Sequence, residues 1–535
     1  MSDETTDGAP PRVWRGRIVR SVTALAVLAL TAAVVASPRP ARADLAGASD
    51  ATLIAVAPPR TTLVCAGPLI LPAAGKADSA FNPVPVAPVT HVDAVTGPGA
   101  SASAPSAATG SLTLLGAATA IAPLDPSTGH ASAALDGPSA PVVVRADPAG
   151  SDPARAAGVT SALVTVGDLR GLAASSCQRP ATDLWLVGGS TEISSSADLV
   201  IDNTGSTSTD VTVEVWGPSG RVELAGGAHV LVAPGAEQVV GLPGIAAEQR
   251  RLVVHLTAAG GNIAAHVQDS LLRGFTPAGT DLVVPGAAPA TRQVVSGIVV
   301  VASTVDGADP AVLRLLVPGA VAAAAHITML GAGGVVALPG ADSIDLAPGD
   351  VTDVPLGGLP AGAYTAVVDA PVPLVAAAMI TRPGLPGQLD DTPTLERAWA
   401  ASGYPGAGSL VAVPRGTAAS LVLAAVADGA DPSAGGTVTA TLRALGSNGG
   451  VLAERSVDVA AGSTTLLDVA SLGLDVTGIE IEPARDNPAG VRVAWSLLVT
   501  VTQPDGVLVS VLLPTPDGQD VTQVPVRSET RLGLG

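Results

Sequence analysis

Short stretches in which apolar and polar residues alternate recur along the chain beyond residue 180, and no long stretch keeps a helical period. Clear examples are 211–216, 325–330 and 438–443, and a glycine-containing turn follows each of them. Alternation with a period of two is typical of strands that bury one face. The pattern therefore predicts an all-β protein.

The turns after these strands repeat at a nearly constant spacing. They begin at Gly217, Gly331 and Gly446, with offsets of 331 − 217 = 114 and 446 − 331 = 115 residues. A second turn, four residues long, also occurs three times. Its copies end at Gly235, Gly349 and Gly462, with offsets of 349 − 235 = 114 and 462 − 349 = 113 residues. Two independent signals with one period predict three homologous modules.

Each module has room for about seven short strands, which is typical of an immunoglobulin- or fibronectin-like β-sandwich. We therefore expect tandem sandwich modules at 181–290, 291–400 and 401–515, followed by a tail at 516–535. Residues 44–180 differ, because strand-like pieces flank a stretch rich in Ala, Ser, Pro and Gly at 78–138. This composition predicts a small β domain with a flexible insertion.

The N-terminus has the order of a secretory signal. An apolar run at 21–36 follows a basic stretch and precedes the small-residue pattern Ala41-Arg42-Ala43. The basic residues are Arg12, Arg15, Arg17 and Arg20. The run of 36 − 21 + 1 = 16 residues is shorter than the ~20 of a spanning helix, so a signal peptide at 1–43 is favoured over an uncleaved membrane anchor. Either alternative predicts an extracytoplasmic protein, secreted or anchored by its N-terminal helix.

The charge of the chain excludes two classes of partner. The net charge is −19, and no cluster of Lys or Arg occurs beyond residue 20. Nucleic acids and anionic lipid head groups both require a basic surface. We therefore expect no nucleic-acid partner, and membrane contact only through the N-terminal helix.

The chain has two cysteines, Cys65 and Cys177, both in the part expected to be exported. Outside the cytoplasm an even pair predicts a disulfide. The alternative is two buried free thiols. A metal site is less favoured, since neither cysteine has a histidine at ligand spacing.

Three segments resemble a known family. They are the sequences RGLAASSC at 170–177, DLWLVGG at 183–189 and TTLVCAGP at 61–68. Together they resemble a family of large secreted proteins from high-GC Gram-positive bacteria that is known only as a domain of unknown function. The resemblance supports export and implies no activity, cofactor or partner.

Motifs of the usual envelope enzymes are missing. The sequence contains no Gly-x-Ser-x-Gly, no Ser-x-x-Lys, no His-Glu-x-x-His and no phosphate-binding loop. We therefore expect a protein that is not an enzyme and binds no cofactor. A hydrolase that uses scattered carboxylates is the least favoured hypothesis.

Two groups of candidate metal ligands also have simple structural explanations. A hairpin at Gly260-Gly261 would place His255 and His266 opposite each other, and a paired surface patch is favoured over a metal site because a third ligand is missing. Asp202 and Asn203 before Gly205 suggest either a calcium loop or an Asx turn, and the turn is favoured.

Aromatic residues are few, and their positions separate two functional hypotheses. Trp216 and Trp495 lie within strands that are predicted to form the core. Trp185, Trp399 and Tyr404 lie near module boundaries. These three form either a seam between modules, which is favoured, or a candidate binding edge. The sequence predicts a non-enzymatic envelope scaffold or protein-binding array. The alternative is an array of carbohydrate-binding modules for a cell-wall or secreted glycan, which exposed aromatics in a groove would favour.

Overall fold

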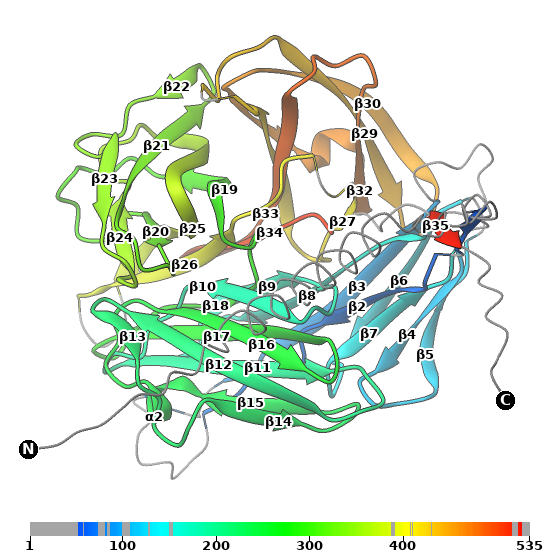
Figure 1. Ribbon diagram of the computed structural model, residues 1–535, viewed down its shortest axis with the longest axis horizontal. Coiled ribbons are helices and arrows are strands. Elements are labelled where there is room, and N and C mark those ends of the chain that lie inside the picture. Colours follow the sequence, from blue (N-terminus) through cyan, green and yellow to red (C-terminus); the bar gives the residue numbers. More distant parts are fainter. Residues whose placement is uncertain are drawn as a thin grey trace, which may run out of the picture. The chain divides into compact units, whose positions relative to one another are not determined.

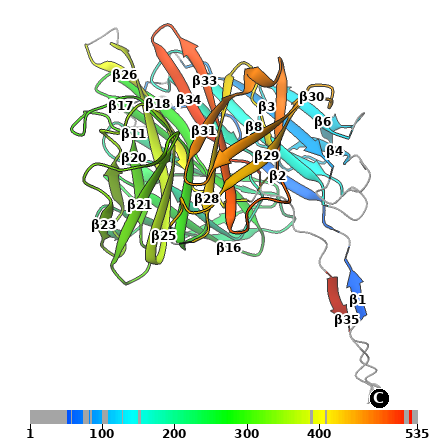
Figure 2. The ribbon, with the colours of Figure 1, turned by 90° about the horizontal axis from the view of Figure 1, so that it is seen from above.

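The chain divides into two units, Ala57–Val521 and a smaller one formed by Met1–Val56 and Thr522–Gly535. The computed structural model describes residues 52–56, 58–72, 81–82, 86–98, 108–126, 129–148, 153–386, 391–406, 408, 410–429, 431–515 and 523–526. The predicted signal or anchor at 1–43 lies outside these residues, as does most of the tail at 516–535. In the smaller unit, β1 (Thr52–Ala55) and β35 (Gln523–Val526) form an antiparallel pair (Figure 2).

Strands make up almost all regular structure of the described residues, as the alternating pattern predicts. The exceptions are a four-residue helix, α2 (Leu242–Ile245), and a 3₁₀ turn, η1 (Val469–Leu472). Within the described ranges, no helix combines the length and the apolarity that a membrane span requires. The all-β prediction is confirmed.

The larger unit consists of four β-sandwiches. The strands of the first are β2 (Thr61–Cys65), β3 (Val89–Gly97), β4 (Gly110–Leu114), β5 (Ala120–Leu124), β6 (Ala131–Asp136), β7 (Val142–Ala146), β8 (Arg155–Val164) and β9 (Gly171–Ser176). Those of the second are β10 (Asp183–Val187), β11 (Ser195–Asn203), β12 (Thr209–Gly217), β13 (Gly220–Val222), β14 (His229–Val232), β15 (Glu237–Gly241), β16 (Val253–Ala259), β17 (Ile263–Arg273) and β18 (Thr276–Val283).

The other two sandwiches follow along the chain. The third has β19 (Ala290–Val300), β20 (Val312–Leu316), β21 (Ala323–Gly331), β22 (Gly334–Val336), β23 (Ser343–Leu346), β24 (Thr352–Pro355), β25 (Gly362–Pro386) and β26 (Pro393–Ala401). The fourth has β27 (Leu410–Ala412), β28 (Ala418–Ala427), β29 (Thr437–Gly446), β30 (Val451–Ala460), β31 (Thr464–Asp468), β32 (Val476–Pro483), β33 (Val491–Gln503) and β34 (Gly506–Leu512).

All four sandwiches share one topology. In the first, the two antiparallel sheets have the orders β2-β7-β4-β5 and β6-β3-β8-β9. The fourth repeats them as β27-β32-β29-β30 and β31-β28-β33-β34, and the second has the same two sheets with β14 added beside β12. In the third, β25 serves both sheets, because it pairs first with β19 and β21 and further along with β20 and β26. The repeated turns that begin at Gly217, Gly331 and Gly446 join equivalent strands of the last three sandwiches.

The first sandwich corrects one expectation. The segment 78–138, predicted as a flexible insertion, contains β3, β4, β5 and β6. Strand β3 explains why no alternation is visible, because its last six residues, 92–97, are all buried and include the small residues Ala94 and Gly97. Small side chains there allow close packing on both faces of the strand, so the alternation that marks a half-buried strand is missing.

The last strand of each sandwich lies in the middle of the unit. These central strands are β9, β18, β26 and β34, and each contacts the next in a closed cycle (Figure 1). Glycines permit the close approach: a Cβ on Gly171 would lie 2.7 Å from the backbone of Thr280, and one on Gly279 would lie 2.6 Å from Arg397 N.

Each sandwich shares buried apolar residues with its neighbours. Leu172 and Ala174 of the first sandwich lie in the core of the fourth, and Val422 and Val511 of the fourth lie in the core of the third. Leu316 and Val375 of the third lie in the core of the second. Leu272 and Leu282 of the second pack beside Leu169 of the first. The four sandwiches therefore share buried surface around the whole cycle.

Candidate functional site

The described residues form a pocket where the chain leaves the central strands. Its walls come from the segments that follow these strands, 177–179, 284–287, 402–404 and 513–515, together with nearby side chains. Its volume is about 190 Å³. We call it the linker pocket. Its position follows from the topology, since all four central strands run in one direction and their C-terminal ends meet.

Two aromatic side chains of the linker pocket are fixed by hydrogen bonds. The Tyr404 residue is 55% exposed, and its hydroxyl accepts a 2.7 Å bond from the backbone N–H of Ala288. Trp495 is buried, and its indole Nε1 donates to the carbonyl of Gly408 at 3.2 Å. Both rings therefore have restricted orientations before anything binds.

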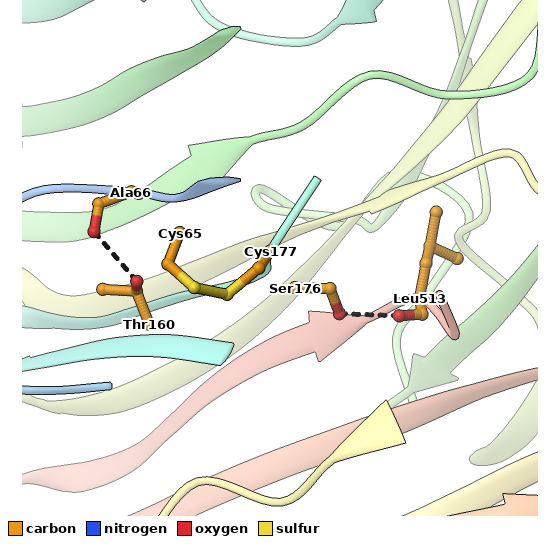
Figure 3. Close-up of a disulfide and its surroundings, with 6 residues drawn as sticks. All are labelled: Cys65, Ala66, Thr160, Ser176, Cys177 and Leu513. Atoms are coloured by element: carbon orange, nitrogen blue, oxygen red, sulfur yellow. Dashed lines mark hydrogen bonds between the residues drawn. A yellow bond between two sulfur atoms is a disulfide. The ribbon is translucent and has the colours of Figure 1, made fainter. Parts of the chain in front are cut away.

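The predicted disulfide is present and supports one side of the pocket. Cys65 is bonded to Cys177, which lines the pocket. Gly158 leaves room for the bridge, since a Cβ there would lie 2.6 Å from Cys177 Sγ. Next to the bridge, Ser176 Oγ donates to the carbonyl of Leu513 at 2.6 Å and so joins the first sandwich to the fourth (Figure 3).

Charge is nearly missing from the walls of the linker pocket. Among the described residues that line it, no Asp or Glu occurs, and Arg179 is the one charged side chain. The polar residues that line it include Ser402, whose Oγ accepts from Ala287 N at 3.2 Å. The pocket is therefore an apolar hollow with a few polar atoms at its edge.

The three residues of the predicted seam or binding edge differ in burial. Trp399 is buried between the second and third sandwiches, where its indole Nε1 donates to Asp269 and the guanidinium of Arg314 lies 4.8 Å from its ring. Trp185 is also buried. Of the three, Tyr404 alone lines the linker pocket.

His255 and His266 do not face each other, so both the predicted surface patch and the metal alternative are wrong for this pair. They lie in β16 and β17, which belong to different sheets of the second sandwich. His255 stacks on Trp185 with ring centroids 4.0 Å apart, and its two nitrogens lie 2.9 Å from Glu214 and 3.2 Å from Asp183. Burial lowers the pKa of His266 to about 4. Over the described ranges, no group of three or more His, Cys, Asp or Glu side chains could hold a metal ion.

The residues around Gly205 form the favoured Asx turn. Asn203 Oδ1 accepts from Gly205 N at 2.8 Å, and its Nδ2 donates to the carbonyls of Thr207 and Val232. Asp202 points away from that turn and lies opposite Glu237 in the strand pair. Burial, followed by the charge of Glu237, raises the pKa of Asp202 well above its usual range.

Two buried carboxyl groups among the central strands were not anticipated. Glu396 Oε1 accepts from the backbone N–H groups of Leu172 at 2.9 Å and Val509 at 3.4 Å. Asp281 Oδ2 accepts from Trp399 N at 2.7 Å, and its Oδ1 lies 2.9 Å from Ser510 Oγ. These bonds join all four sandwiches, and three of them pair backbone N–H groups of the central strands, those of Leu172, Val509 and Trp399.

Burial raises the pKa of both groups to about 8. The geometry around Ser510 agrees with a protonated Asp281. Ser510 Oγ has two acceptors in reach, Asp281 Oδ1 and the carbonyl of Ala174 at 3.0 Å, but a hydroxyl has one proton to donate. A proton on Asp281 Oδ1 allows both bonds to form.

The contact between the first and fourth sandwiches contains an ion-pair network. Arg155 of β8 lies 2.5 Å from Glu480 and 3.0 Å from Glu482, both of β32. Burial raises the pKa of Glu480, but nearby His130, Arg155 and Arg443 outweigh it and lower that pKa to about 2. Glu480 is therefore ionised over the whole physiological range.

The fold and the disulfide define the class of this protein. It is a disulfide-bonded all-β protein built from four sandwiches of the same topology. Residues 131–470, more than half of the chain, match the family of unknown function DUF5719, and the chain belongs to this family. The match includes the segments 170–177 and 183–189, and it leaves 61–68 outside. No curated protein and no solved structure matches the chain.

Proposed function

We propose that this chain is a non-enzymatic protein of the extracytoplasmic cell envelope, a scaffold or protein-binding array that is secreted or anchored through its N-terminal segment. The observation that carries the proposal is the closed cycle of four sandwiches with shared cores. Such an arrangement holds separate surfaces at fixed positions, as a scaffold requires. The disulfide is compatible with an extracytoplasmic location.

The buried acids support a structural role. Carboxyl groups with a pKa near neutrality are often catalytic, and Asp281 and Glu396 have this property. Both are, however, at most 2% exposed, and both accept backbone N–H groups of neighbouring sandwiches. Neither lines the linker pocket. Their raised pKa is explained by packing, with no substrate required.

Glycan binding is the alternative, and one observation favours it. Tyr404 presents an exposed ring, and sugars stack on such rings. The burial of Trp185 and Trp399 counts against it, because a glycan platform requires exposed aromatics.

Cross-linking on intact cells tests the proposal. The chain has a single lysine, Lys76, but 46 Asp and Glu residues, so the reagent is a membrane-impermeant dihydrazide that couples carboxyl groups. The same cells supply the intact mass of the protein, measured with and without reductant in the culture fluid, the membranes and the cytoplasm. We expect reproducible cross-links to envelope proteins, and a mass two hydrogens lower before reduction.

Two results would contradict the proposal. One is a cytoplasmic protein with two free thiols. The other is an exported protein that forms no protein cross-links but binds purified cell-wall glycan and is eluted by soluble sugar, which would favour the alternative.

A further inference from the structure

The linker pocket has the size of a site for one small ring. An apolar cavity of ~150 Å³ accommodates benzene, and the volume here is about 190 Å³. Pockets for cofactors and drug-sized ligands typically span ~300–1,000 Å³. The size thus favours a single aromatic group over a cofactor or a saccharide chain.

The walls suit such a ring. Leu184, Val294, Leu513 and two prolines supply aliphatic surface, and Tyr404 supplies an aromatic side chain. Because the Tyr404 hydroxyl is held by Ala288 N–H, the exposed ring has a fixed orientation. A rigid exposed aromatic side chain gives contact area at a low entropic cost.

The charge of the walls narrows the chemistry of the ligand. Among the lining residues that the structure describes, none is an Asp or a Glu. A cationic ligand would find no counter-ion among these residues, and Arg179, the one charged side chain there, already has an interaction partner within the protein. The hydroxyl groups of a sugar would lose hydrogen bonds to water against the aliphatic part of the walls.

We propose that the linker pocket binds an uncharged aromatic group of the size of a cresol ring. The group belongs either to a small molecule or to a tyrosine-like side chain, and the ring chemistry is the same for both. This inference goes beyond the scaffold role and does not depend on it.

Binding of p-cresol to the purified full chain tests the inference. Ligand-observed NMR titration is expected to show saturable binding, and benzylamine and N-acetylglucosamine are expected not to bind over the same range. Tyr404→Ala should weaken p-cresol binding about fivefold or more, since it removes the stacking surface. The matched control is Phe275→Ala, because Phe275 is 76% exposed and does not line the pocket. It should change the affinity by less than about twofold.

A second variant closes the pocket without removing a contact. Gly403 lines the pocket, and a Cβ built on it would have Leu513 Cδ2 as its nearest neighbour, at 3.9 Å. Gly403→Leu should therefore fill the hollow, retain the thermal unfolding midpoint and abolish binding.

The two sources of the ring are separated by comparing p-cresol with N-acetyl-tyrosinamide. Tighter binding of the amide assigns the ring to a polypeptide side chain, and its exclusion assigns it to a free small molecule. The inference is overturned if p-cresol shows no saturable binding, or if Tyr404→Ala and Gly403→Leu leave its binding unchanged while both variants remain folded.

Discussion

At the scale of single residues, the stability of this protein depends on carboxyl groups in opposite electrostatic situations. Burial raises the pKa of Asp281 and Glu396 to about 8, whereas the cations around Glu480 lower its pKa to about 2. A proton stabilises the first two groups in the folded state, and ionisation stabilises the third. Burial also raises the pKa of three other acids, Asp93, Asp202 and Glu237.

Asp281→Asn tests how a buried carboxyl group that keeps its proton affects stability. The folded state keeps a proton on Asp281 up to pH about 8, while the unfolded chain loses it near the usual value of 3.8. The stability from this proton is complete below pH ~4 and is lost as the pH rises to about 8, by up to ~1.4 kcal/mol per pH unit. An amide always has a proton to donate to Ser510. We therefore expect a flatter pH dependence of the free energy of unfolding, and a variant more stable than the parent at pH 8.

Urea unfolding between pH 4 and pH 9 measures this effect. The charged groups near Asp281 are Asp269, Glu396 and, beyond them, Arg170 and Arg397. Asp342→Asn is the control, since Asp342 is exposed. The interpretation fails if both variants have the parent's pH dependence.

Glu480→Gln tests how a buried carboxylate stabilised by nearby cations affects stability. Its side chain is 3% exposed and pairs with Arg155 across the contact between the first and fourth sandwiches. Removing this carboxylate leaves the buried Arg155 with the more exposed Glu482 as its remaining partner, and we expect a loss of about 3 kcal/mol in the free energy of unfolding at pH 7. The difference from the parent should shrink as the pH falls from the usual 4.5 towards 2, where Glu480 itself becomes protonated.

The matched control lies in the same network. Glu454 pairs with Arg443 but its side chain is 59% exposed, so Glu454→Gln should cost less than about 1 kcal/mol. Equal losses in the two variants would show that burial does not determine the contribution of these ion pairs.

At the scale of elements, the central strands depend on glycines for their spacing. Gly171→Ala would place a methyl group 2.7 Å from the backbone of Thr280 in the neighbouring sandwich. Because backbone cannot move aside as a flexible side chain can, we expect a loss of about 2 kcal/mol or more. Gly319→Ala has no atom within 4 Å of its new methyl group and should change stability by less than about 0.5 kcal/mol. Thermal unfolding of both variants compares them, and similar midpoints would contradict the close approach of β9 and β18.

The strands differ in how far the sequence predicts them. Strand β12 buries alternate residues over most of its length, so its period of two is visible in the chain, and its turn repeats in β21 and β29. Strand β3 buries all of its last six residues, 92–97, so no period of two separates it from a linker. Loops of different length also change the spacing: β11 begins 195 − 89 = 106 residues after β3, and β12 begins 209 − 110 = 99 residues after β4. The period of about 114 residues therefore does not extend to the first sandwich.

The linker pocket was predictable only in fragments. Tyr404 and the pair Cys65–Cys177 are marked by their residue types. Their neighbours Leu184, Val294 and Leu513 resemble any other apolar position. Each comes from a segment separated from the others by many tens of residues, and local periodicity carries no information on which segments meet. The same holds for Glu396, whose backbone partners Leu172 and Val509 lie 224 and 113 residues away.

At the scale of the whole molecule, the closed cycle predicts that the four sandwiches unfold together. Each sandwich shares an apolar cluster with a neighbour, and Glu396, Asp281 and Ser510 connect the central strands through hydrogen bonds. Opening any one contact exposes apolar surface and leaves buried polar groups unpaired. Independent modules would instead have separate stabilities, as in linear repeat arrays.

Calorimetry on residues 44–535 distinguishes these cases. We expect one main transition for the four sandwiches, with a van't Hoff enthalpy close to the calorimetric enthalpy. A chain that ends at residue 406 lacks the fourth sandwich, so the apolar surfaces of Leu172 and Ala174 lose their cover. It should unfold at a lower temperature and bind a hydrophobic dye. A chain that ends at residue 515 keeps every sandwich and serves as the control. Several resolved transitions in the long chain, or a shortened chain as stable as the control, would mean that the sandwiches are independent and that their contacts add little to stability.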